Sequence, residues 1–107
     1  MAVNWEPTVS LHLRIRVVPG RRNNLLKFLN AAKPFYESPG GIHVRLLADE
    51  SDPDRFVEIV EYADEQTYLL DDQRVKRDPD MAAYIAQWHE LLAEPPVVEV
   101  FREANLH

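Results

Sequence analysis

Apolar residues alternate with polar ones in some segments of the chain and recur every three or four positions in others. Residues 9–17 alternate strictly, which is typical of a strand with one apolar and one polar face. Residues 25–35 instead place leucines and phenylalanines at helical spacing, so that they form one apolar stripe. Over the whole chain these patterns predict strands at residues 9–17, 42–47, 56–62 and 97–102, and helices at residues 25–33, 64–77 and 78–92.

Turn residues mark where these elements end. Pro19-Gly20 closes the first strand and Pro39-Gly40-Gly41 turns into the second, because proline cannot donate to a β-ladder and glycine tolerates turn conformations. Asp78-Pro79 has the cap and first-turn proline of a helix start. Pro34 lies inside the first apolar stripe, so we expect the first helix to end or kink near Lys33.

The resulting order is β-α-β-β-α-α-β. It predicts an α+β fold, a ferredoxin-like split βαβ sandwich whose antiparallel four-stranded sheet carries its helices on one face. The other face of the sheet is then left for a partner or for solvent. The first strand places His12, Arg14 and Arg16 on that face. Composition alone does not decide whether a partner or solvent covers it.

Arg14 and Arg16 have two interpretations. If the face is covered, the two guanidinium groups need carboxylate partners, because an unpaired buried charge is costly. Glu99 on the last strand and Glu58 or Glu61 on the third strand are the expected partners. The alternative is that an anionic ligand is recognised by His12, Arg14, His43 and Arg45.

Composition narrows the classes of function. The 107 residues carry a formal net charge of −6, which argues against nucleic acid as a partner because phosphate binding needs a basic face. The chain has no cysteine and its four histidines lack metal-ligand spacing, so we expect no thiol chemistry, disulfide or metal site. Residues 1–10 show no signal-peptide pattern, and the chain has no apolar run of about 18 residues that could span a membrane. We therefore expect a cytoplasmic protein without a transmembrane segment.

Short motifs at the turns resemble the antibiotic biosynthesis monooxygenase-like (ABM) group of the dimeric α/β-barrel superfamily. They occur in the expected order over nearly the whole chain, as Val18-Pro19-Gly20, Pro39-Gly40-Gly41, Arg55-Phe56, Glu61-Tyr62-Ala63-Asp64-Glu65 and Leu92-Ala93-Glu94-Pro95. The resemblance implies that residues 1–107 form a single ABM-like domain. It also implies that two copies dimerise through their sheets into a closed barrel.

The same resemblance bears on chemistry. Members of the group include cofactor-independent oxygenases that act on polycyclic phenols and proteins that degrade haem. Helices of the group commonly carry a histidine where this chain has Asp71, and an aspartate does not ligate haem iron as an imidazole does. We therefore expect no cofactor.

Aromatic side chains with polar tips lie near the expected space between sheet and helices. Tyr62 and Tyr68 flank the start of the second helix, and Tyr84 and Trp88 lie on the third. Such rings suit a pocket for a flat aromatic ligand. The spacing of Tyr84 and Trp88 is also that of ordinary core residues, which is the alternative for both.

Two functions remain open. The first is oxidation of a small aromatic molecule, with His89 or Asp71 as general base and with Tyr62, Tyr68, Tyr84 and Trp88 around the substrate. The second is a non-catalytic homodimeric module for ligand binding or assembly, in which His89 and Asp71 are solvated surface residues. Fold alone does not choose between them. A cavity lined by the polar tips would favour the first, and a solidly packed core would favour the second.

Overall fold

The computed structural model describes residues 6–106. Its elements follow the order β-α-β-β-α-α-β, as predicted. They are β1 (Val9–Arg16), α1 (Arg22–Glu37), β2 (Ile42–Ala48), β3 (Arg55–Tyr62), α2 (Glu65–Arg77), α3 (Pro79–Glu90) and β4 (Val97–Arg102).

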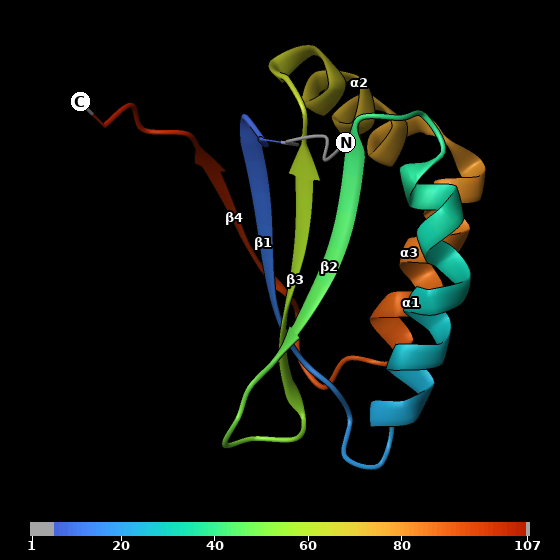
Figure 1. Ribbon diagram of the computed structural model, residues 1–107. Coiled ribbons are helices and arrows are strands. Elements are labelled where there is room, and N and C mark those ends of the chain that lie inside the picture. The colour runs from blue at the N-terminus through green and yellow to red at the C-terminus, as the bar shows by residue number, and fades with distance from the viewer. Residues whose placement is uncertain (1–5, 107) are drawn as a thin grey trace, which may run out of the picture.

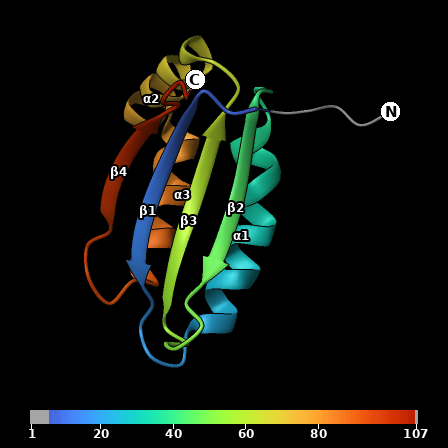
Figure 2. The same cartoon turned by 60° about the vertical axis from the view of Figure 1, so that its left-hand side comes forward.

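The strands form one antiparallel sheet in the order β2-β3-β1-β4. Strand β1 is central, pairing with β3 from Val9 opposite Tyr62 and with β4 from Val9 opposite Arg102. Helices α1 and α3 lie over one face of the sheet and α2 crosses one end (Figure 1), while β4 forms a free edge (Figure 2). The opposite face carries no helix in the part of the chain that the structure describes. The predicted ferredoxin-like fold is confirmed.

The core lies between the sheet and helices α1 and α3. The largest fully buried side chains are Phe56, Leu25, Val9 and Val17. The alternation in β1 and β3 turns one row of each strand toward the helices, where the stripes of α1 and α3 cover it. Trp88 of α3 joins this apolar cluster.

We expected helix α1 to end or kink near Lys33, and an end there is wrong, because the helix runs through Pro34 to Glu37. Proline removes one backbone donor, but Pro34 is exposed, where water can satisfy the carbonyl that is left free. The last turn is held from α2, because the Arg74 guanidinium donates to the backbone carbonyls of Phe35 and Tyr36. Tertiary contacts therefore outweigh the local preference of proline.

The face of the sheet away from the helices carries ion pairs that form within the chain. Arg14 Nε donates to Glu99 Oε1 at 2.5 Å, which confirms one of the predicted partners. Arg16 instead pairs with Asp52 of the loop between β2 and β3, at 2.8 Å. Glu58 does not lie on this face, so it is not the partner of either arginine.

Two aspartates cap helices α2 and α3. Asp64 accepts from the backbone N–H of Thr67 at 2.7 Å, and Asp78 accepts from that of Asp80 at 2.8 Å. The predicted start of the third helix at Asp78-Pro79 is thus confirmed. No helix within residues 6–106 is long and apolar enough to cross a membrane.

Candidate functional site

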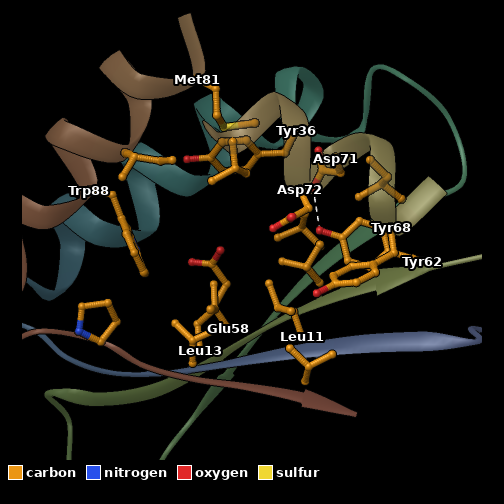
Figure 3. A pocket seen from close by; sticks show the side chains of 18 of the residues that line it. Leu11, Leu13, Tyr36, Glu58, Tyr62, Tyr68, Asp71, Asp72, Met81 and Trp88 are labelled. Carbon is orange, nitrogen blue, oxygen red and sulfur yellow. Dashed lines mark hydrogen bonds between the residues drawn. The ribbon is translucent and has the colours of Figure 1, made fainter. Parts of the chain in front are cut away.

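A cavity of about 440 Å³ lies between the helix-facing side of the sheet and helices α2 and α3 (Figure 3). Leu11, Leu13 and Val60 form part of its floor, and Met81 and Trp88 approach from α3. Its volume falls within the range of roughly 300–1,000 Å³ that is typical of small-molecule sites. Among residues 6–106, no group of three or more histidine, aspartate or glutamate side chains is placed to hold a metal ion.

Glu58 brings a buried carboxyl group to the floor of this cavity. In β3 it belongs to the row that faces the helices, together with Phe56, Val60 and Tyr62, because side chains alternate along a strand. Its side chain points into the cavity from the sheet (Figure 3) and the residue is only 4% exposed. Glu58 Oε1 has no hydrogen-bond partner among the described residues. Burial raises the pKa of this carboxyl to about 7.

Trp88 also lines this cavity and carries a second buried polar atom without a partner. The residue is 8% exposed, and its indole Nε1 also lacks a hydrogen-bond partner among the described residues. A buried donor or acceptor without a partner is costly, and most such groups in folded proteins are satisfied. Glu58 Oε1 and Trp88 Nε1 are thus an acceptor and a donor, on two residues that line the cavity, that no described residue satisfies.

Asp71 lines the cavity and is hydrogen-bonded to Tyr62 and Arg74. Its Oδ2 accepts from the Tyr62 hydroxyl at 2.5 Å, and its Oδ1 accepts from Arg74 at 3.4 Å. Burial raises the pKa of Asp71, although the hydrogen bonds from Tyr62 and Arg74 oppose this rise. Because the Tyr62 proton is committed to Asp71, the Tyr62 oxygen is left to the cavity as an acceptor.

Tyr36 reaches the cavity from α1. Burial raises the pKa of its hydroxyl, and the negative charge of Glu58 raises it further. Tyr36 therefore stays protonated at neutral pH and can donate a hydrogen bond. Figure 3 shows its ring on the helix side of the cavity, with Glu58 on the sheet side.

Known structures share this architecture, although no family model and no curated protein matches the sequence. SnoaB from Streptomyces nogalater, described as a cofactor-independent oxygenase and solved as a mutant, is 15% identical, with a TM-score of 0.76 over 94% of this chain and 97% of that chain. The chain has the ABM fold. A protein of Bordetella bronchiseptica, provisionally named an antibiotic biosynthesis monooxygenase, is 22% identical, with a TM-score of 0.75 over 94% of this chain and 100% of that chain. Rv0793 from Mycobacterium tuberculosis is 25% identical, with a TM-score of 0.70 over 92% of this chain and 96% of that chain.

Within the ABM fold, the structure brings most of the predicted site residues together. Those that line the cavity are Tyr62, Tyr68, Asp71, Trp88 and His89. Tyr84 instead turns toward α1 and stacks on Phe35, with ring centroids 4.7 Å apart. Arg14 lies on the opposite face of the sheet, paired with Glu99, because it belongs to the other row of β1. Neither Tyr84 nor Arg14 reaches the cavity.

Sequence reasoning did not place Glu58 or Tyr36 at the cavity. Glu58 carried a usable signal, since it is the one charged residue in the row Phe56, Glu58, Val60 and Tyr62. Tyr36 carried none, because it follows Pro34 and lies beyond the predicted end of the first helix.

Proposed function

We propose that the chain binds a small aromatic molecule in this cavity and oxidises it with molecular oxygen, without a cofactor. The observation that carries the proposal is the pair of unpartnered buried groups, Glu58 Oε1 and Trp88 Nε1, in one apolar and aromatic cavity. A ligand that accepts from one and donates to the other satisfies both. The shared fold with SnoaB, a cofactor-independent oxygenase, supports the choice of reaction.

The chemistry depends on an electron-rich ring. An aromatic ring with an ionised hydroxyl group can react with oxygen directly once it is shielded from water. In the overall reaction O2 is the oxidant: one oxygen atom becomes a carbonyl on a ring carbon, and the other leaves as water with two hydrogens, one from that carbon and one from the hydroxyl group. The chain contributes orientation and exclusion of water. Tyr62 and Tyr68, edge to face with centroids 5.3 Å apart, provide an aromatic wall for this purpose.

Ligand binding in the cavity can be tested by filling part of its space with a larger side chain on β4. Val98 of β4 and Leu70 of α2 have the same exposed fraction, 56%, but only Val98 lines the cavity. We expect Val98→Trp to weaken the binding of phenols about tenfold, since it occupies ligand space. The thermal shift and oxygen uptake produced by a panel of one- to three-ring phenols measure this effect. Leu70→Trp is the matched control and should keep both signals. Equal losses in the two variants would contradict a ligand site in this cavity.

The second candidate function, a homodimeric module, is supported by the sheet face without helices. Leu47, Val97 and Phe101 on this face are between 46% and 56% exposed. The Arg14 and Glu99 charges beside them pair within the chain, so the face can be covered without leaving a charge unpaired. We propose that a second copy of the chain covers this face. Because the cavity lies on the opposite side of the sheet, dimerisation and ligand binding can occur together.

Assembly is tested by placing a charge on this face. Phe101→Glu introduces an unpaired carboxylate where the ring now contacts His12, with centroids 4.7 Å apart. We expect light scattering to give the mass of two chains for the native protein and of one chain for this variant. Leu70→Glu, at an exposed position of α2, is the control and should stay dimeric. A native protein with the mass of one chain would contradict the homodimer.

A further inference from the structure

The cavity is acidic on its inner surface. Its described lining includes Glu58, Asp71 and Asp72 but no lysine or arginine. Arg74 balances Asp71 from behind the wall, at 3.4 Å. The charge of Glu58 has no such partner, and desolvation is the cause of its perturbed acidity. An anionic ligand would therefore meet an uncompensated carboxylate.

We infer that the site selects an uncharged, weakly acidic ligand of the phenol class, whose hydroxyl proton is accepted by Glu58 Oε1 while Trp88 Nε1 donates to an oxygen of the same molecule. This inference rests on the proposed function and names the ligand class and the proton acceptor of that site. In the transfer, the O–H bond of the ligand breaks and an Oε1–H bond forms. The negative charge moves from Glu58 to the ligand oxygen, so the net charge of the complex does not change.

The two bases expected from the sequence are less suited to this step. Both oxygens of Asp71 already accept hydrogen bonds, from Tyr62 and from Arg74. His89 lies on the exposed flank of α3, with its ring 5.3 Å from that of Trp88. Glu58 is buried, unpartnered and aimed into the cavity, which is the arrangement of a group that exchanges a proton with a bound molecule.

The neighbours of Glu58 define the expected pH dependence. The other titratable groups on the cavity are Tyr36 of α1, Tyr62 of β3, Tyr68, Asp71 and Asp72 of α2, and His89 of α3, whereas β1, β2 and β4 contribute apolar side chains. Burial places the pKa of Glu58 at about 7. Above this pKa and that of the ligand, a carboxylate and a phenolate would face each other without a shared proton, so binding is lost.

The test uses 4-nitrophenol, whose phenol and phenolate forms absorb differently, and 4-nitrobenzoate as its anionic counterpart. For the native protein we expect the affinities for 4-nitrophenol and 4-nitrobenzoate both to fall about tenfold from about pH 6 to about pH 9, because Glu58 can share a proton with an anionic ligand below its pKa and repels that ligand above it. Glu58→Gln should flatten the pH dependence for both ligands and strengthen 4-nitrobenzoate binding at about pH 9. Glu58→Asp, which keeps a carboxylate, should retain the native pH dependence.

Glu61→Gln is the matched control, since Glu61 lies on the same strand but pairs with Arg45 on the opposite face. It should behave as the native protein does. Identical pH profiles for the native protein and Glu58→Gln, with 4-nitrophenol bound by both, would overturn the role of Glu58 and leave the cavity as an aromatic site. Failure of the native protein to bind any phenol would overturn the proposed function as well.

Discussion

Glu58→Gln is expected to remove most of the loss of stability that the native protein shows as the pH rises from about 4.5 to about 7. The folded-state pKa of Glu58, about 7, lies above its ordinary value of 4.5, because burial penalises the charged form. Between these values Glu58 binds more protons in the folded protein than in the unfolded chain, so its contribution to stability is fully present below about pH 4.5 and is lost as the pH rises through 7. The shift corresponds to about 3 kcal/mol in the free energy of unfolding.

The measurement is urea unfolding at a series of pH values for the native protein and two glutamine variants. Glu58→Gln should show a nearly flat profile over this window, apart from a contribution of Asp71, whose raised pKa acts in the same direction. Glu61→Gln removes a carboxylate from the same strand outside the core and should keep the native slope. The same slope in both variants would mean that Glu58 is not desolvated.

Arg74→Met is expected to lower the free energy of unfolding by about 3 kcal/mol, since it leaves a buried carboxylate without its cation. The side chains of Arg74 and Asp71 are 14% and 8% exposed. The same guanidinium donates to the carbonyls of Phe35 and Tyr36 and lies 4.3 Å from the centroid of the Phe35 ring. The change therefore removes an ion pair, a helix cap and a cation–π contact together.

Lys76→Met is the matched control, because it removes a positive charge from the same helix by the same substitution. Lys76 pairs with Asp72 at 2.7 Å on the exposed surface, and such pairs contribute about 0–1 kcal/mol. Adding Asp71→Asn to Arg74→Met should recover part of the loss, since the unpaired charge is then gone. Equal effects of the two methionine substitutions would contradict a structural role for the network.

The fold could be predicted because its signals are local. The strict alternation of residues 9–17 distinguishes the two faces of β1, and Asp78-Pro79 carries the start of α3 within two residues. The course of α1 past Pro34 could not be predicted in this way. It depends on Arg74, which contacts the end of α1 from 39 residues away in the sequence.

The site was harder to predict than the fold because it depends on how each helix is rotated about its axis and on how deeply each side chain is buried. Tyr84 and Trp88 lie on the same helix at helical spacing, yet Tyr84 packs on α1 and Trp88 lines the cavity. Helical spacing predicts that both residues belong to the apolar stripe of α3. It does not predict which element each ring contacts. Glu58 could be assigned to the helix-facing row from alternation, but its lack of a partner depends on every element around it.

The most direct measurement is the pH titration of the Glu58 carboxyl carbon by 13C NMR, assigned by the loss of its signal in Glu58→Gln. We predict a midpoint at about 7, as expected for a buried carboxyl without a partner, and a displaced midpoint when 4-nitrophenol is bound. A midpoint near the ordinary 4.5, unchanged by 4-nitrophenol, would contradict the assignment of Glu58 as the unpaired group of a ligand site.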